Sequence, residues 1–261
     1  MENVIVIKMG GSTLGSHDTT LEDIVALQKQ GKSLVVIHGG GKVITDWLTR
    51  QGIQTKFVRG ERVTDKASLE VVTAVLAGLT NKELVAALNN LGGRAIGVSG
   101  VDGALIQAKM PDAEKGYVGE VVKVNTELLE TLLGAWFVPV ISPVSLYAFD
   151  RPSDAPLLLN VNADLIAGDI AAALKAEKLI FLTDVAGVND KSGKTLEKLS
   201  AAEAEKLIAS GTASGGMIPK IKACLKALET VPLARIIDGR EPHALLKEVK
   251  GQDGGTTIYS E

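Results

Sequence analysis

The sequence predicts an α/β protein, a three-layer αβα sandwich with a mainly parallel central sheet, and three observations support this prediction. Short aliphatic runs alternate with longer segments of helical period along the chain. The aliphatic runs are almost uninterrupted, as expected for strands that are covered on both faces. Glycines follow directly after the first two runs, where the strands of an open sheet end and ligands bind.

Six runs rich in Val, Ile and Leu are predicted to be strands: residues 4–8, 34–38, 95–99, 137–142, 179–183 and 235–238. Helical periodicity predicts helices at residues 21–30, 43–51, 66–91, 125–133, 163–174, 201–209 and 219–228. Two stretches break the alternation. Residues 105–124 are predicted to form a hairpin, and residues 145–159 a loop or hairpin over one face. Because no linker or repeat separates these elements, we expect two lobes that share one sheet.

Composition narrows the class of protein. Of the 261 residues, 46% are hydrophobic and 23% are charged, which is typical of a globular protein with a sizeable core. The formal net charge of −3 and the 3% of aromatic residues argue against a nucleic acid partner, which requires basic patches or stacking side chains.

The cellular location is predicted from cysteine use and apolar runs. The single cysteine, Cys224, lies among aliphatic residues and is predicted to be a small buried hydrophobe in a reducing compartment. The strand expected at residue 4 leaves no room for a signal peptide. Lys175, Glu177 and Lys178 interrupt the apolar run that comes nearest to the length of a membrane helix. We therefore expect a cytoplasmic protein without a membrane partner.

Glycine-rich turns follow the first two predicted strands, at residues 10–11 and 39–41. Backbone N–H groups in such turns bind phosphate oxygens well, although glycines there also serve simply to form tight turns. No P-loop is present, because Val188 occupies the first glycine position upstream of residues 193–195, and no G-x-G-x-x-G follows either strand. Two such turns together with Lys8 favour phosphate binding of another kind.

Two lysines are candidate ligands of an anion. Lys8 ends an otherwise apolar strand, either because it acts in a site or because the strand reaches the surface there. Lys220 follows Pro219, which suits the first position of a helix, so Lys220 is predicted to lie in the first helical turn. A cation is unfavourable at that end of a helix, and this inconsistency indicates a function such as binding an anionic ligand.

Polar residues near two other helix starts complete the candidate site. Asn162 is predicted to cap the following helix, with Asp164 favourable in the first turn, whereas Asn160 lies outside the cap and is better explained by ligand contact. Arg62 has the geometry to bind a substrate carboxylate, and a surface ion pair is the alternative. We expect Thr64 to cap the long helix that follows it.

Eight motifs occur in order along the chain: Lys8-Met-Gly-Gly11, His38-Gly-Gly-Gly41, Arg62-Val-Thr64, Gly116-Tyr-Val-Gly-Glu120, Asn160-Val-Asn-Ala-Asp164, Leu182-Thr-Asp-Val-Ala-Gly187, Ser214-Gly-Gly-Met-Ile-Pro-Lys220 and Asp238-Gly-Arg240. In this combination the chain resembles the amino acid kinase family nearly end to end. It is most similar to the members that phosphorylate N-acetyl-L-glutamate. The resemblance implies the amino acid kinase fold and ATP-dependent phosphorylation of the γ-carboxylate of N-acetyl-L-glutamate, the second step of arginine biosynthesis.

The same resemblance implies roles for individual residues. The implied catalytic residues are Lys8, Lys220, Asp164, Gly11 and Gly40. The implied contacts of acetylglutamate are Gly40, Gly41, Arg62 and Asn160. The implied contacts of the nucleotide are Lys8, Gly10, Gly11, Thr183, Asp184, Gly187 and Lys220. Mg²⁺ would be held mainly through the nucleotide phosphates, with no metal site on the protein. Because the acceptor is already a carboxylate, no general base is needed, and His38 is interpreted as structural.

The resemblance further implies that residues 1–170 bind acetylglutamate and dimerise and that residues 171–261 bind ATP. The helix after Thr64 is the expected dimer surface, at about residues 65–79, unless its apolar side chains are buried within the monomer. Those side chains are Leu69, Val72, Ala74, Val75, Leu76 and Leu79. Two other functions stay open. One is a kinase for α-aminoadipate or glutamate attached to a carrier protein, and the other is a sensor that binds an amino acid or nucleotide without turnover.

Three features depart from the family pattern. Ala186 stands where a proline is usual, and residues 145–159 form a longer stretch than expected, which bears on substrate selectivity. The segment before the first strand is too short for the N-terminal helix of arginine-inhibited hexameric relatives. We therefore expect no hexamer and weak or absent inhibition by arginine.

Overall fold

The structure of this chain is a computed structural model, which describes residues 3–10, 19–58, 61–252 and 254–260. The strands of its large sheet are β1 (Val4–Met9), β2 (Ser33–His38), β5 (Ala95–Gly100), β6 (Ile106–Lys109), β7 (Val118–Val124), β8 (Val138–Tyr147), β9 (Leu158–Val161), β10 (Lys178–Thr183), β11 (Lys198–Ser200), β12 (Leu233–Asp238) and β13 (Thr256–Tyr259). Two further strands, β3 (Phe57–Val58) and β4 (Glu61–Arg62), form a separate small hairpin.

The α-helices of the described residues are α1 (Thr20–Lys29), α2 (Gly41–Arg50), α3 (Lys66–Thr73), α4 (Asn81–Asn90), α5 (Glu127–Gly134), α6 (Ala163–Leu174), α7 (Ala201–Ala209), α8 (Met217–Ala227) and α9 (Ala244–Val249). A π-helical segment, η1 (Ala74–Thr80), joins α3 to α4, and two 3₁₀ turns are η2 (Asp102–Ala104) and η3 (Ala113–Lys115). The predicted helices are all present.

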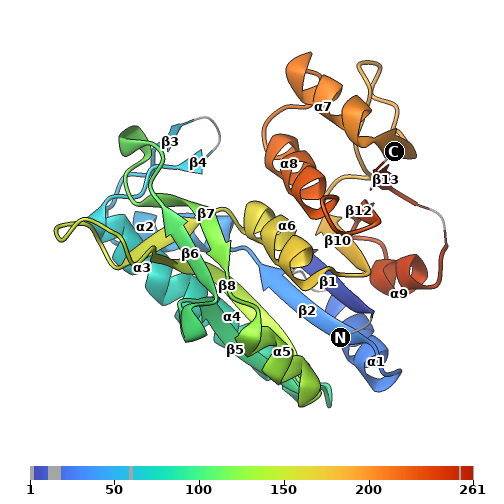
Figure 1. Cartoon of the computed structure of the whole chain (residues 1–261), viewed down its shortest axis with the longest axis horizontal. Coiled ribbons are helices and arrows are strands. Elements are labelled where there is room, and N and C mark those ends of the chain that lie inside the picture. Colours follow the sequence, from blue (N-terminus) through green and yellow to red (C-terminus); the bar gives the residue numbers. More distant parts are fainter. Residues whose placement is uncertain (1–2, 11–18, 59–60, 253, 261) are drawn as a thin grey trace.

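The large sheet has the strand order β11-β13-β12-β10-β1-β2-β8-β6-β7-β9, with β5 paired to β8. Among the described residues, eight of its eleven strand pairings are parallel. Helices pack on both faces, and the chain from α7 to β13 gathers at one end of the elongated molecule (Figure 1). The predicted three-layer α/β sandwich with a mainly parallel sheet is therefore confirmed.

Burial on both faces explains the uninterrupted apolar runs. In β1, Val4 and Val6 pack into the core cluster that contains α6 and α8. Ile5, Ile7 and Met9 pack into the opposite cluster, with α1 and α4. Each fully buried side chain of this kind contributes about 1.5–3 kcal/mol to folding, so both faces of the central strands must be apolar. The strand register aligns Lys8 with Ile37 and Met9 with both His38 and Leu182, so β1, β2 and β10 end at one edge of the sheet.

The two irregular stretches are both hairpins. Strands β6 and β7 pair antiparallel, as predicted for residues 105–124. Strand β8 continues five residues past its predicted end at residue 142 and pairs antiparallel with β9, which makes residues 145–159 a hairpin. The strands β3, β4, β11 and β13 and the helix α9 were not predicted, because segments of two to six residues show no clear periodicity.

The helical stretch Lys66–Asn90 is long and apolar enough, by length and composition only, to cross a membrane, with a mean hydropathy of 1.5 in its most apolar window. This corrects the expectation that the run interrupted by Lys175, Glu177 and Lys178 comes nearest to a membrane helix. Of its residues, 44% are buried inside the protein, and helices in the core of soluble proteins meet the same criterion.

Most apolar side chains expected at the dimer surface are buried within the monomer. Leu69, Val72, Val75 and Leu76 are all less than 9% exposed, and three of them pack against α2 together with Ile44. Of the six side chains named for this surface, Ala74 and Leu79 are exposed. The apolar character of the helix is therefore explained largely by the core of the monomer.

Candidate active site

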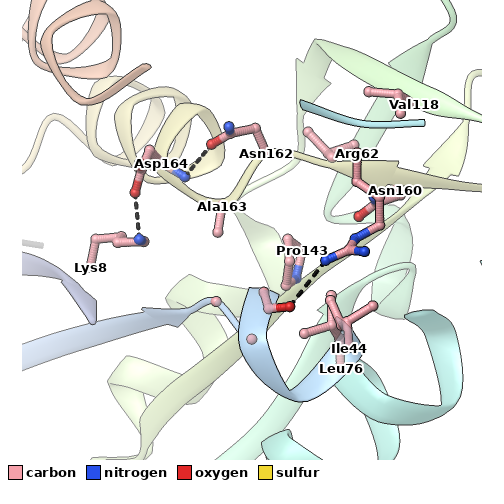
Figure 2. A pocket seen from close by; sticks show the side chains of 14 residues that line it. Lys8, Ile44, Arg62, Leu76, Val118, Pro143, Asn160, Asn162, Ala163 and Asp164 are labelled. Carbon is pink, nitrogen blue, oxygen red and sulfur yellow. Dashed lines mark hydrogen bonds and ion pairs between the residues drawn. The ribbon is translucent and has the colours of Figure 1, made fainter. Parts of the chain in front are cut away.

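A cavity of about 240 Å³ opens at the sheet edge where β1 and β2 end. Its lining residues come from β1, the β2–α2 turn, α2, β4, η1, β7, β8, β9 and the start of α6: Lys8, Gly39, Gly40, Gly41, Ile44, Arg62, Leu76, Val118, Pro143, Asn160, Val161, Asn162, Ala163 and Asp164. Figure 2 shows Lys8 and Asp164 on one side of this cavity and Arg62 and Asn160 on the other. The structure thus brings six of the twelve site residues expected from the sequence into the lining of one cavity.

Lys8, Asp164 and Lys220 form one buried charge cluster. Lys8 Nζ lies 2.5 Å from Asp164 Oδ1, and Lys220 Nζ lies 3.0 Å from Asp164 Oδ2. The three side chains are 8%, 8% and 14% exposed, in the order Lys8, Asp164, Lys220. Lys8 is therefore not at the surface, which excludes the alternative considered for it. Two ammonium groups around one carboxylate leave a net positive charge that favours an anion beside them.

Local structure positions each member of the cluster. Asn162 caps α6, because its side chain accepts hydrogen bonds from the N–H groups of Asp164 and Leu165, and this fixes Asp164 in the first turn as predicted. Helix α8 begins at Met217, so the prediction that Pro219 is its first residue is wrong by two positions. The first four N–H groups of a helix have no partner inside it, so a proline fits anywhere in that turn. Lys220 still lies near the helix start, as expected.

Two opposing effects act on the Asp164 carboxyl. Burial alone raises its pKa, because a charged carboxylate loses hydration. Lys8 and Lys220 outweigh this effect and hold the pKa of Asp164 below its ordinary value. Asp164 therefore remains a carboxylate at neutral pH and can fix the positions of both ammonium groups.

The turn after β2 presents the start of α2 to the cavity. Gly40 is the residue before the first helical residue, Gly41, and both line the cavity. A Cβ atom on Gly40 would lie 2.6 Å from Leu76 Cδ2, so a larger residue would have to displace the Leu76 side chain of η1. The unsatisfied N–H groups and positive dipole of a helix start suit an anion.

The first glycine turn is described only in part. The N–H of Gly10 donates to the carbonyl of Leu182 at 2.9 Å, so it extends the pairing of β1 with β10 and does not point to a ligand. This corrects the expectation that Gly10, in the first glycine turn, binds phosphate oxygens through its N–H. Gly11 lies outside the described residues.

Arg62 is held in place by uncharged oxygens. Its Nη1 donates to Thr55 Oγ1 at 3.1 Å, and its Nη2 donates to Thr45 Oγ1 at 2.7 Å and to the Gly41 carbonyl at 3.0 Å. The residue is only 9% exposed, so its side chain does not lie at the surface, and burial lowers its pKa. Thr45 and Thr55 were not predicted, although Thr45 lies one helical turn after Gly41 and its hydroxyl also donates to the Gly41 carbonyl.

Asn160 lies in β9 between two strands, opposite Val118 of β7 and Val144 of β8. Its Nδ2 donates to Thr64 Oγ1 at 3.1 Å. The prediction that Thr64 caps the long helix is wrong. Asp65 is the cap, because its carboxylate accepts from the N–H of Ser68, while the Thr64 hydroxyl donates to the Arg62 carbonyl. Thr64 therefore connects the two residues expected to bind the acceptor.

Three of the residues expected at the nucleotide, Thr183, Asp184 and Gly187, lie at the end of β10 or just after it, outside the cavity lining. Thr183 is the last residue of β10 and donates to Asp184 Oδ1 at 3.3 Å. Asp184 is exposed, and Gly187 is buried next to Thr256. Lys220 is also outside the cavity lining and reaches it through Asp164. The apolar lining residues Ile44, Leu76, Val118 and Pro143 were not expected in the site, because apolar side chains carry no chemical signal, and Leu76 was assigned to the dimer surface instead.

Cys224 lies in the core beneath the charge cluster. It is fully buried, and burial raises the pKa of its thiol. The predicted role as a small buried hydrophobe is confirmed, because a thiol in this state is neither accessible nor ionised at neutral pH.

Comparison with known proteins agrees with this geometry. The sequence model of the amino acid kinase family matches residues 3–238. The chain is 53% identical to acetylglutamate kinase of Dehalococcoides mccartyi (strain CBDB1), over 99% of this chain and 95% of that protein. It is 45% identical to acetylglutamate kinase of Cereibacter sphaeroides (strain ATCC 17029 / ATH 2.4.9), over 98% of this chain and 87% of that protein.

Solved structures give the same picture. N-acetylglutamate synthase of Neisseria gonorrhoeae, solved with coenzyme A and N-acetyl-glutamate, is 27% identical with a TM-score of 0.84, over 99% of this chain and 60% of that one. Carbamate kinase of Giardia lamblia bound to AMP-PNP shares the fold, at 16% identity and a TM-score of 0.73 over 99% of both chains. The family model matches most of the chain, and the relatives are 45–53% identical to it. The chain therefore belongs to the amino acid kinase family.

Proposed function

We propose that this chain is an acetylglutamate kinase, which uses ATP to phosphorylate the γ-carboxylate of N-acetyl-L-glutamate and forms N-acetyl-L-glutamyl 5-phosphate in arginine biosynthesis. One observation carries the proposal: a single cavity has the Lys8–Asp164 end of the charge cluster on one side and Arg62 with Asn160 on the other (Figure 2). The relatives at 45–53% identity bear this name and support the assignment.

The donor set fits the phosphates of ATP. Lys8 and Lys220 bring two positive charges to one place, and the start of α2 adds backbone N–H groups. ATP supplies the phosphoryl group. Lys8, Lys220, Thr183, Asp184 and Gly187 are proposed to contact the nucleotide, together with Gly11 and with atoms of Gly10 other than its N–H.

Mg²⁺ is proposed to be held through the nucleotide phosphates. Within the described residues, no three His, Cys, Asp or Glu side chains gather to hold a metal ion. The protein's own contribution to charge neutralisation would then come from the lysines and the glycine turn.

The acceptor is proposed to lie across the cavity. Arg62 has a planar fork that matches a carboxylate, and its hydrogen bonds to Thr45, Thr55 and Gly41 hold that fork in one orientation. Asn160 offers a second polar group, and Gly40 and Gly41 line the floor. These contacts would align the γ-carboxylate with the positive end of the cavity.

The chemistry that remains for the protein is alignment and charge stabilisation. A carboxylate is already a nucleophile, so no side chain has to remove a proton. Lys8 and Lys220, fixed by Asp164, are proposed to stabilise the charge on the transferring group. Preorganised donors of this kind are worth about 2.7–4 kcal/mol each to the transition state.

The proposal extends to the whole chain. Residues 1–170 are proposed to bind acetylglutamate and to dimerise through the helix near residues 65–79, with Ala74, Gly78 and Leu79 exposed on it. Residues 171–261 are proposed to bind ATP. We also propose a cytoplasmic location, which the single buried cysteine supports.

A second candidate is a sensor of the same fold. The gonococcal synthase has the same fold at 27% identity and was solved with N-acetyl-glutamate, so a related fold also occurs in a protein that is not named a kinase. The complete Lys8–Asp164–Lys220 cluster favours catalysis over a sensor. A kinase for carrier-linked α-aminoadipate or glutamate is the third possibility.

The test is ADP release from MgATP with N-acetylglutamate, glutamate or α-aminoadipate as acceptor, with hydroxylamine present to trap the acyl phosphate. We expect turnover and hydroxamate formation with N-acetylglutamate alone. Turnover with α-aminoadipate or glutamate in its place would contradict the proposed substrate. ATP binding without ADP release on any acceptor would favour the sensor.

A further inference from the structure

His38 lies behind the glycine turn, on the face of the sheet opposite to the charge cluster. It ends β2 and is completely buried. Alternation along β2 places His38 on the same face as Leu34 and Val36, which pack with α1 and α4. Lys8 instead shares a face with Val4 and Val6, toward α6. His38 is buried by packing on the α1 and α4 face and not by the cavity. Its hydrogen bonds nevertheless extend to the glycine turn.

The hydrogen bonds of His38 define its tautomer. His38 Nδ1 lies 3.0 Å from the Gly39 carbonyl oxygen, and a carbonyl only accepts, so Nδ1 carries the proton. Nε2 is then the acceptor for Asn81 Nδ2 at 3.2 Å. Asn81 is itself completely buried and donates to the Val140 carbonyl at 2.9 Å. Lys82 Nζ donates to Asn81 Oδ1 at 3.0 Å, which fixes the orientation of the amide.

The Gly39–Gly40 peptide is trans, as are the other peptide bonds of the described residues. In a trans peptide the carbonyl and the following N–H point in opposite directions. A Gly39 carbonyl held toward His38 therefore turns the N–H of Gly40 away from the α4 face. The opposite face holds the charge cluster, and Lys8 Nζ lies 4.0 Å from the position that a Cβ on Gly39 would occupy.

We infer that His38 and Asn81 are positioning residues, which hold the Gly39–Gly40 peptide so that the Gly40 N–H faces the reacting groups. This inference rests on the proposed function, because it assigns the N–H a role in phosphoryl transfer. The π-helical segment η1 contributes to the same arrangement. Its Leu76 packs against Gly40, and Asn81 follows directly at its end. Such segments occur often at functional sites.

The protonation state of His38 agrees with the hydrogen bonds. Burial lowers the pKa of His38 to about 4, so the ring is neutral at physiological pH and Nε2 is free to accept from Asn81. A neutral donor at Nδ1 orients the peptide without adding charge beside Lys8.

Three variants of His38 test the inference by the position of their donor. In His38→Asn the amide nitrogen takes the place of Nδ1, so the bond to Gly39 is kept. In His38→Gln the amide nitrogen takes the place of Nε2, so the bond to Gly39 is lost. In His38→Leu the bonds to Gly39 and to Asn81 are both lost. A 1 Å misplacement in an active site can cost about 100-fold in rate, so we expect kcat to fall by about 10- to 100-fold in His38→Leu and His38→Gln. His38→Asn should retain most of the wild-type kcat.

Controls separate positioning from folding. The dissociation constants of ATP and N-acetylglutamate, measured by calorimetry, should stay near the wild-type values in the variants. A misfolded binding site would instead weaken the binding of both ligands. His243→Leu, at an exposed histidine paired with Asp23, should leave kcat unchanged. The ¹⁵N spectrum of the wild-type ring should show the proton on Nδ1.

The outcomes are distinguishable. If the wild type is active, either of two results overturns this inference alone. One is a His38→Leu variant with the kcat of the wild type, and the other is a proton on Nε2 of His38. A wild type that binds ATP and N-acetylglutamate without phosphoryl transfer overturns the proposed function and this inference with it. Low kcat in His38→Leu and His38→Gln, with rescue in His38→Asn, supports it.

Discussion

At the scale of the residue, Asp164 determines how the two lysines are held. A buried carboxylate is costly unless it is paired, and removing one partner of such a pair leaves an uncompensated charge. Here two partners share one carboxylate, so the loss of either lysine leaves Asp164 still paired with the other. Each lysine can therefore be replaced with less risk to folding than a single buried ion pair would present.

Lys220→Ala is expected to lower kcat by about 100- to 1,000-fold, the effect of losing one preorganised donor at a developing charge. The matched control is Lys226→Ala on the same helix, where the exposed ion pair with Glu229 contributes little. Steady-state kinetics and thermal unfolding of both variants check this. A Lys220→Ala enzyme with near-normal kcat, or a Lys226→Ala enzyme with an equal loss, would contradict the role of Lys220.

His38 gives a pH dependence of stability. Its folded pKa, about 4, is depressed from an ordinary value of 6.5, so between these pH values the unfolded chain binds a proton that the folded chain does not. The free energy of unfolding should therefore fall as the pH decreases from 6.5 to 4. Above pH 6.5 the contribution of the neutral His38 to stability is complete. Urea unfolding at a series of pH values should show a shallower dependence in His38→Asn. An identical dependence in wild type and variant would refute this.

At the scale of the element, the packing of α6 on α8 sets the distance between Asp164 and Lys220. A Cβ on Gly168 of α6 would lie 2.4 Å from the backbone oxygen of Ala223 in α8, so the helices touch there without room for a methyl group. The two helices carry the two halves of one ion pair. Close packing at Gly168 is therefore part of the active-site geometry.

Gly168→Ala is expected to lower the free energy of unfolding by about 1–3 kcal/mol through overpacking. It should also lower kcat, because α8 must move and carries Lys220 with it. Gly134→Ala in α5 is the control, since nothing lies within 4 Å of its added Cβ and alanine favours a helix. Urea unfolding and kcat are measured together. A Gly168→Ala protein as stable and active as wild type would show that the helices can separate at no cost.

The elements that the sequence predicted are those with long, regular patterns. β1, β2, β10 and α6 were placed to within a residue or two, because burial on both faces leaves an uninterrupted apolar run. The partners of Arg62 were not predicted, because Thr45 and Thr55 meet it only once α2 and β4 are packed together. The cap of α3 was misplaced by one residue, since Thr64 and Asp65 are both good caps and Thr64 is used to hold Asn160.

At the scale of the whole molecule, the sheet explains why distant motifs act together. Lys8 and Gly40 lie at the ends of the neighbouring strands β1 and β2, so one edge of the sheet brings them together. That gathering was predictable from the positions of glycines after strands. Asn160 reaches the same cavity from β9, which β8 separates from β2. The apolar composition of the long helix was a poor guide to the dimer surface. Four of the six side chains assigned to that surface are buried in the core of the monomer.

The exposed part of that helix still allows a prediction about assembly. Ala74, Gly78 and Leu79 form an exposed strip of small and apolar residues on η1, and close contact of two such helices would bury it. We expect a dimer by light scattering and a monomer when Ala74→Arg and Leu79→Arg are combined. Leu91→Arg, at an exposed position beyond α4, is the control. A dimeric double variant would show that the subunits meet elsewhere.

The proposed reaction joins a phosphoryl group to the γ-carboxylate of N-acetylglutamate. The most direct measurement uses N-acetylglutamate with ¹⁸O in that carboxylate, MgATP and hydroxylamine. Hydroxylamine attacks the acyl carbon and releases phosphate with the bridging oxygen, so ³¹P spectroscopy shows which oxygen formed the bond. We predict one ¹⁸O in the released phosphate, and none when only the α-carboxylate is labelled. Released phosphate without ¹⁸O from the γ-labelled substrate would show that the γ-carboxylate is not the acceptor.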